Sequence, residues 1–267
     1  MTNAGAEATA AEAKAVEAKA RERLQALAAS LRRAAKRPAE AESIHRLRVS
    51  IRRFTQVLRV FGRGFEHTRR MRRRLRGLMD LCGAVRNCDI AGEVLKAAQA
   101  PVDRTLRARL KRRRRLAGRD LARSLQDGTL RVHMRHWSGW LKTYEGETPR
   151  PPFPLSREFV RAGSTAAQAG AEYSQMHEFR LMVKKLRYTL EILGCPDQEL
   201  VLLRGLQERL GAINDCVTTA DLISDIKLPP SRQRQIKAAL NRLLARRAAE
   251  FRLYWRENLG RRKKTIA

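Results

Sequence analysis

Residues 44–54 of the chain read IHRLRVSIRRF, and residues 176–188 read MHEFRLMVKKLRY. A histidine, an arginine and a basic pair recur in the same register in both stretches. A second pair of blocks follows in the same order. LRGL at 75–78 returns at 203–206, and GAVRNC at 83–88 returns as GAINDC at 211–216. Blocks that recur in one order predict a duplicated structural unit.

Both opening stretches have the periodicity of an amphipathic helix, with an apolar stripe and a separate polar arc at about 100° per residue. The apolar stripes predict the core faces, and they hold Leu47, Ile51, Phe54, Leu58 and Phe61 in one copy and Phe179, Val183, Leu186, Leu190 and Leu193 in the other. The polar arcs hold His45, Arg48, Arg52, Gln56 and Arg59, and His177, Arg180, Lys184, Tyr188 and Glu191. Both arcs thus repeat histidine, arginine and a further cation.

The rest of the chain also predicts helices, because Ala, Leu and Arg dominate and β-branched runs are absent. Helical patterns cover 41–61, 66–85, a shorter stretch from 89, a basic stretch after Pro101 to about 125, 155–170, 173–193, 198–213, a short stretch after 214, and a long one after Pro230. Four prolines within 146–154 predict a linker. We therefore expect an all-α protein with an N-terminal Ala/Glu/Lys-rich helix in 1–40, bundles at 41–145 and 155–258, and a basic tail at 259–267.

Charge is the strongest functional signal. The chain holds 57 Lys and Arg against 27 Asp and Glu, a formal net charge of +30. Repulsion among so many like charges destabilises the folded state, so an anionic partner is expected. Nucleic acid, a membrane surface and polyphosphate all fit this charge. Arginine offers a planar fork matched to phosphate oxygens, and successive helical turns place cations about 5.4 Å apart.

The duplicated helices and the blocks after them resemble the CHAD domain, the histidine-containing α-helical domain family. The resemblance covers roughly 43–255. It implies two pseudo-symmetric four-helix bundles with a central basic groove that binds inorganic polyphosphate, in some members on polyphosphate granules. Carried over by position, it assigns ligand roles to His45, Arg48, Arg52, Arg53, His177, Arg180, Lys184, Lys185 and Arg187. The ExExK motif of the triphosphate-tunnel domain often fused to this family is missing. Glu178 and Glu191 make the second copy less basic than the first.

Further cations are candidates on grounds other than the resemblance, namely a place on a polar arc or clustering in the sequence. Arg59 lies on the first polar arc, and Arg72, Arg73 and Arg76 form a run beyond it. The 111–115 run, KRRRR, extends a polyanion track or serves solubility, and the run at 261–264 predicts a solvated tail. Either Asn87 or Asp89, and either Asn214 or Asp215, is expected to cap a helix that restarts after a glycine rather than to bind a cation.

Neither the phosphate-cradling GxxxxGK[ST] loop nor the GxSxG elbow occurs, and we find no paired catalytic carboxylates. We therefore expect a binding protein that is not an enzyme and that needs no cofactor or metal. Free thiols at Cys82, Cys88, Cys195 and Cys216, with no signal peptide or apolar span, predict a cytoplasmic protein.

Two alternatives to polyphosphate binding remain. The first is nonspecific nucleic-acid binding, which +30 favours at low salt. Single-strand binders add aromatic platforms for bases, and of the aromatics in these two helices only Tyr188 falls on a polar arc. The second is an enzyme that acts on phosphate chains, for which the sequence offers no catalytic residues.

Overall fold

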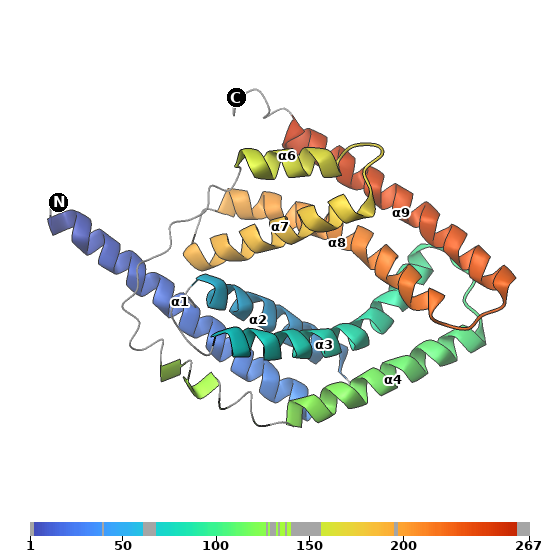
Figure 1. Cartoon of the computed structure of the whole chain (residues 1–267), viewed down its shortest axis with the longest axis horizontal. Helices are drawn as coiled ribbons and strands as arrows, with labels where there is room; N and C mark the ends of the chain where they lie inside the picture. The colour runs from blue at the N-terminus through green and yellow to red at the C-terminus, as the bar shows by residue number, and fades with distance from the viewer. Residues whose placement is uncertain are drawn as a thin grey trace. The chain divides into compact units, whose positions relative to one another are not determined.

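The computed structural model describes residues 3–38, 40–60, 68–126, 156–194 and 197–260, together with residues 128, 132, 134–136 and 138–139. Within these ranges the chain is helical and forms no strand, which confirms the all-α prediction (Figure 1). The long helices are α1 (Asn3–Lys36), α2 (Ala41–Val60), α3 (Thr68–Ala97), α4 (Arg104–Gln126), α6 (Arg157–Ala166), α7 (Tyr173–Leu193), α8 (Asp197–Ser224) and α9 (Pro230–Asn258). The predicted linker at 146–154 and the tail from 261 lie outside the described residues.

Several helix boundaries follow from local chemistry. Proline interrupts the helical hydrogen bonds, so α1 ends at Lys36, two residues before Pro38. Pro230 is the first residue of α9, a position whose N–H has no intrahelical partner in any helix. The Ser156 hydroxyl accepts a hydrogen bond from the Phe159 N–H and caps α6. The predicted limits of 173–193 match α7 residue for residue.

The predicted helix breaks near Gly83 and Gly211 are wrong. α3 runs without interruption from Thr68 to Ala97, and α8 from Asp197 to Ser224. Asn87, Asp89, Asn214 and Asp215 therefore lie inside helices and cap neither of them. A glycine inside a helix costs only about 1 kcal/mol, which tertiary packing outweighs. At Gly83 the packing is visible, since an added Cβ would lie 3.4 Å from the NH1 of Arg48.

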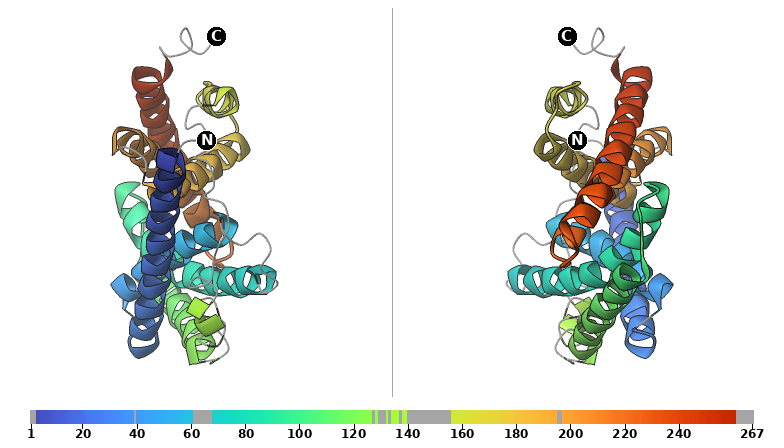
Figure 2. Two further views of the ribbon diagram at one scale, coloured as in Figure 1. Left: turned by 90° about the vertical axis from the view of Figure 1, so that its left-hand side faces the viewer. Right: turned by 90° about the vertical axis from the view of Figure 1, so that its right-hand side faces the viewer.

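The chain divides into two compact units that do not follow a single cut in the sequence. The first unit holds residues 1–86, 113–150 and 192–194, and the second holds 87–112, 151–191 and 195–267. α1 packs against α2 within the first, and α8 packs against α9 within the second (Figures 1 and 2). The division into bundles at 41–145 and 155–258 stays a prediction, and the units add that 87–112 pack with the second half.

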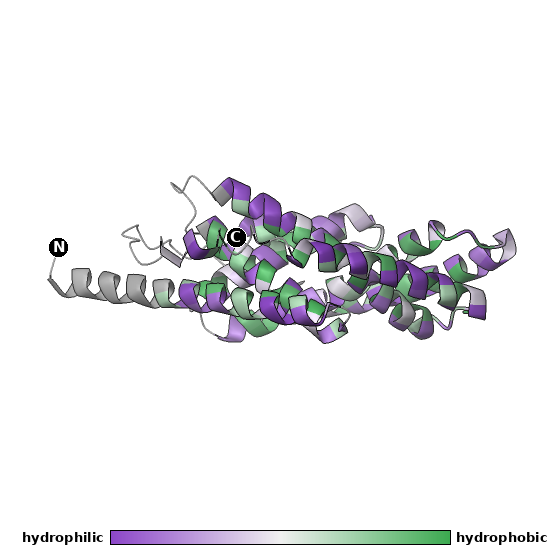
Figure 3. Ribbon diagram, turned by 90° about the horizontal axis from the view of Figure 1, so that it is seen from below, coloured by the Kyte–Doolittle hydropathy of each residue, from purple (hydrophilic) through white to green (hydrophobic). Residues whose placement is uncertain are grey.

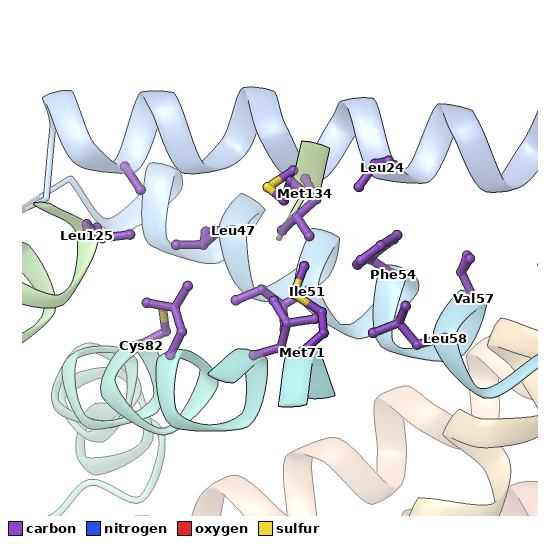
Figure 4. Packing of buried hydrophobic residues seen from close by; sticks show 14 of the residues in the cluster. Leu24, Leu47, Ile51, Phe54, Val57, Leu58, Met71, Cys82, Leu125 and Met134 are labelled. Carbon is purple, nitrogen blue, oxygen red and sulfur yellow. The ribbon is translucent and has the colours of Figure 1, made fainter. Parts of the chain in front are cut away.

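The core of the first unit is built from the apolar stripe of α2. Leu47, Ile51, Phe54 and Leu58 are almost fully buried, as predicted, and Phe61 lies outside the described residues. Figure 4 shows these side chains with partners from α1, α3 and α4, among them Leu24, Met71, Cys82 and Leu125. A buried Leu, Ile or Phe contributes roughly 1.5–3 kcal/mol, so this stripe fixes which side of α2 faces outward.

The second unit has two apolar clusters. One surrounds Phe179, whose ring centroid lies 5.1 Å from that of Phe159 and 5.4 Å from that of Trp255. Val183, Leu186 and Leu190 are buried as the periodicity predicted, while Leu193 is partly buried. The other cluster joins the end of α3 and the start of α4 to α8 and α9, and it includes Cys88 and Cys216.

Hydropathy follows this packing. Apolar and polar residues alternate in bands along the described helices (Figure 3), as expected where one stripe of each helix is buried. None of the described helices is long and apolar enough to cross a bilayer.

Candidate functional site

α2 and α3 form an antiparallel pair that joins the two sequence blocks of the first repeat. Arg48, three residues after His45, reaches Gly83 of α3. Arg86, one turn further along α3, acts electrostatically on the His45 ring. At the other end of the pair, Arg59 of α2 lies within electrostatic range of Arg72 and Arg76 of α3. The blocks that recur in the sequence therefore meet in space.

These residues define the first cationic face. It consists of His45, Arg48, Arg52 and Arg59 from α2 and Arg72, Arg76 and Arg86 from α3. Along α2 it extends over about 21 Å, given the rise of about 1.5 Å per residue. None of its members is fully buried, and His45, Arg59 and Arg76 are exposed. The structure thus brings together predicted residues from both helices, including Arg72 and Arg76, for which only clustering had argued.

The like charges of this face act on one another. Partial burial, followed by Arg72 and Arg76, lowers the pKa of Arg59, which nevertheless stays protonated at any ordinary pH. Loss of solvent and the charge of Arg86 lower the pKa of His45, while Glu42 opposes them. His45 is therefore mostly neutral near pH 7. A bound anion would offset this repulsion and raise the histidine pKa.

The second cationic face consists of His177, Arg180 and Lys184 of α7 together with Arg247 of α9. A polar network ties it to α8. The Oδ1 of Asn214 accepts hydrogen bonds from Arg180 NH2 at 2.6 Å and from the Tyr173 hydroxyl at 3.0 Å. The same hydroxyl lies 3.2 Å from Nδ1 of His177. Because the hydroxyl donates its proton to Asn214, Nδ1 of His177 carries the proton in their contact.

Arg247 holds α9 against α8 beside this network. Its NH1 donates to the Ala212 carbonyl at 2.7 Å and lies 3.2 Å from the sulfur of Cys216. Burial raises the pKa of the neighbouring Asp215 carboxyl, and the charges of Arg180, Arg247 and Lys184 oppose that rise. Burial and Arg180 also lower the pKa of His177. The second face therefore combines its cations with a carboxylate inside the same cluster.

Two residues predicted on the polar arcs are buried instead. Gln56 is 4% exposed, and its Oε1 accepts a hydrogen bond from Arg59 at 3.4 Å. Tyr188 is 6% exposed, and the Arg187 guanidinium covers its ring at 4.5 Å from the centroid. Both lie at the edge of an arc, where neighbouring helices cover more of the surface than a helical wheel predicts. The basic arc of α7 therefore loses the one aromatic residue assigned to it.

Arg187 is a buried ion-pair partner. Its NH1 donates to Glu191 at 2.8 Å and its Nε to Gln207 of α8 at 2.9 Å, and the side chains of the ion pair are only 11% and 12% exposed. Glu191, expected to reduce the charge of the polar arc, is this partner. The contacts of Arg187 thus hold α7 to α8.

The remaining predicted residues lie at the borders of the two faces. Arg53 and Lys185 each follow a member of a face. Arg53 is half-buried and Lys185 is exposed, and Arg73 is exposed beside Arg72.

In the 111–115 run of α4, residues 111, 112 and 115 are exposed and 113 and 114 are half-buried. Within the described residues, no group of three or more His, Cys, Asp or Glu side chains could hold a metal ion.

Four residues were not predicted from the sequence as part of the site: Arg86 and Arg247 of the two faces, and Tyr173 and Asn214 of the polar network beside the second face. A signal existed for Arg86 and Asn214, because they occupy the same position of the second repeated block. Reading that block only as a helix start hid their role. Arg247 had no such signal, since α9 carries many cations and only its packing against α8 singles this one out.

Comparisons with known proteins agree with this architecture. The family model described as CHAD domain matches residues 15–224. Among solved structures, the chain is similar to PptA from Streptomyces chartreusis, with a TM-score of 0.69, 14% identity, and coverage of 91% of this chain and 99% of that one. It is also similar to the CHAD domain from the plant Ricinus communis, with a TM-score of 0.64, 18% identity, and coverage of 95% and 89%. No curated protein matches the chain.

Proposed function

Because the chain belongs to the CHAD domain family, we propose that it binds inorganic polyphosphate through its two cationic faces. The observation that carries the proposal is the arginine cluster of the first face, in which partial burial and then the charges of Arg72 and Arg76 lower the pKa of Arg59. Like charges held together by a fold cost free energy that a bound polyanion recovers. A linear chain of phosphates suits a face that runs along a helix.

The chemistry of the side chains favours phosphate oxygens. Six of the seven members of the first face are arginines, whose planar donors bind phosphate in pairs. Of the aromatic residues on this side of α7, Tyr188 is buried, and Tyr173 is half-buried with its hydroxyl bonded to Asn214. Bases of a single-stranded nucleic acid would therefore gain little from stacking there, and nucleic acid is the secondary candidate.

The proposal has three further parts. The protein acts as a binding module and not as an enzyme. It binds polyphosphate in the cytoplasm, in association with polyphosphate granules. The central groove between two bundles, which the family resemblance implies, stays a prediction.

The test is a competition titration at physiological salt between long-chain polyphosphate and single-stranded RNA. The first-face variant is Arg59→Ala, Arg72→Ala, Arg76→Ala. We expect wild type to prefer polyphosphate and the variant to bind it roughly 1,000-fold more weakly, because each of the three charge-assisted contacts contributes about 1.5 kcal/mol. The slope of log affinity against log salt should also fall by about 2, at roughly 0.7 per phosphate contact.

A matched control removes the same charge elsewhere. Arg234, Lys237 and Arg242 are exposed on α9, and their triple alanine variant lowers the net charge equally. This control should bind polyphosphate nearly as tightly as wild type. Equal loss in both variants would mean that the affinity is a diffuse effect of net charge. Equal competition by RNA would favour the nucleic-acid alternative.

A further inference from the structure

One position of the repeated second block differs in charge between the two faces. In the first unit this position is Arg86, a cation close enough to His45 to lower its pKa. In the second unit it is Asn214, whose Oδ1 accepts a 2.6 Å hydrogen bond from Arg180. The repeat matches Arg180 with Arg48. Where the first face has the cation Arg86, the second unit has the neutral acceptor Asn214. Asn214 binds Arg180, a cation of the second face.

The next position strengthens the difference. The repeat matches Asn87 with Asp215, a half-buried carboxylate of α8. The charges of Arg180 and Lys184 of α7 and of Arg247 of α9 act on Asp215. Three of the cations of the second face therefore already act on a negative charge that belongs to the protein.

This arrangement changes what a phosphate would gain. Arginine has five N–H donors, but the shortest contact of Arg180 already uses one of them on Asn214. A phosphate bound by Arg180 or Lys184 would also lie near the Asp215 carboxylate, and like charges repel. Arg180 and Lys184 are thus partly neutralised by groups of the protein itself.

We propose that Asn214 and Asp215 make the second cationic face the weaker of two unequal polyphosphate sites, so that a chain occupies the first face before the second. This inference rests on the proposed function. It assigns specificity-determining roles to two residues of α8 that attract no phosphate themselves. It also predicts that the affinity of the second face can be raised by giving it the residues of the first.

The first experiment installs those residues. Asn214→Arg with Asp215→Asn is made in the background of the first-face triple alanine variant, so that the first face is weakened and the second contributes a larger share of the polyphosphate affinity. We expect about tenfold tighter binding, from one added phosphate contact and one removed repulsion. The control Asn241→Arg with Glu257→Gln makes the same charge change at exposed positions of α9. Circular dichroism and thermal unfolding verify that each variant is folded.

The reciprocal experiment weakens the first face in the otherwise native chain. Arg86→Asn should lower the affinity for polyphosphate about tenfold, while Arg119→Asn, an exposed arginine of α4, should lower it less than twofold. A measurement on the native protein covers the case of a misfolded variant. The ring protons of His45, assigned by NMR from His45→Gln, should shift at lower polyphosphate concentration than those of His177, assigned from His177→Gln.

The outcomes separate the two claims. Native protein that binds polyphosphate while the α8 exchange and its control change affinity equally would overturn the inference and leave the proposed function standing. His177 resonances that shift before those of His45 would also overturn it. Native protein that does not bind polyphosphate would overturn the proposed function, and the inference with it.

Discussion

The ion pair between Arg187 and Glu191 indicates that Arg187 has a structural role, although it lies in the same motif as the proposed ligands. The family resemblance assigns Arg187 to the polyphosphate ligands. In the structure its guanidinium contacts Glu191 at 2.8 Å and Gln207 at 2.9 Å, and the side chains of the ion pair are 11% and 12% exposed. We therefore predict that Arg187 stabilises the fold and contributes little to binding.

The magnitude follows from the burial. Arg187→Ala leaves the Glu191 carboxylate without its cation in a nearly dry site, a change that costs roughly 3–5 kcal/mol in buried pairs. We take about 3 kcal/mol, because both side chains retain some solvent. At about 2–4 °C per kcal/mol, the melting temperature should fall by roughly 6–12 °C. Arg187→Met with Glu191→Leu removes both charges and should restore most of the loss.

The assay combines urea unfolding with polyphosphate titration below the melting temperature. Lys185→Ala is the matched control, since it removes one cation two positions earlier from an exposed site. We expect the opposite pattern for it, with native stability and a few-fold weaker binding. An Arg187→Ala protein with native stability and strongly weakened binding would refute the reasoning and return Arg187 to the ligands.

Other predictions concern packing and pH. Gly163→Ala should lower the free energy of unfolding by about 3 kcal/mol or more in urea, because its Cβ would overlap the Trp255 ring and lie 2.8 Å from the Phe179 ring. Gly211→Ala, with no heavy atom within 4 Å of its Cβ, should gain up to about 1 kcal/mol in the same assay. The pKa of His45 and that of His177 are lowered in the free protein, so protonation destabilises it, and without ligand the melting temperature should fall as the pH drops below about 6.5. A bound polyanion raises the same pKa values, so polyphosphate affinity measured by calorimetry should rise over the same pH range, and His45→Gln should flatten that rise. A melting temperature that increases on acidification without ligand, or an affinity that does not respond to pH, would contradict this account.

The fold was predictable where a long amphipathic pattern allowed only one side of a helix to be buried. The stripe through Leu47, Ile51, Phe54 and Leu58 could be buried only by turning one side of α2 inward, and the structure does so. The limits of α7 were equally clear, since helical periodicity begins at Tyr173 and ends before Gly194, whose φ of 71° suits glycine.

Local sequence signals gave wrong predictions where contacts between helices determined the helix ends and the burial of side chains. Gly83 and Gly211 suggested helix ends, but long helices continue through both because packing outweighs the propensity of one glycine. Gln56 and Tyr188 were assigned to the polar arcs by angle alone. A helical wheel describes one helix, while the burial of an edge position depends on the neighbours that pack over it.

The site was predictable in its residue types and only partly in its pairing. The repeat identified Arg48 and Arg180, and clustering identified Arg72 and Arg76. The sequence could not show that α3 returns antiparallel to α2, which brings Arg72 and Arg76 to Arg59 and Arg86 to His45. That arrangement requires the crossing of two helices, and no periodicity within either helix encodes it.

The antiparallel pairing also explains why a duplicated helix pair suits a linear anion. One helix presents cations every turn, and a second helix that returns beside it can add cations along the same line. In the first unit the returning helix supplies three arginines: Arg72, Arg76 and Arg86. In the second unit the returning helix α8 supplies Asn214 and Asp215 where α3 supplies Arg86 and Asn87. Since the core stripes of α2 and α7 remain alike while these positions differ, the difference lies in charge and not in packing, and it predicts unequal affinity from two faces built on the same repeated helix pair.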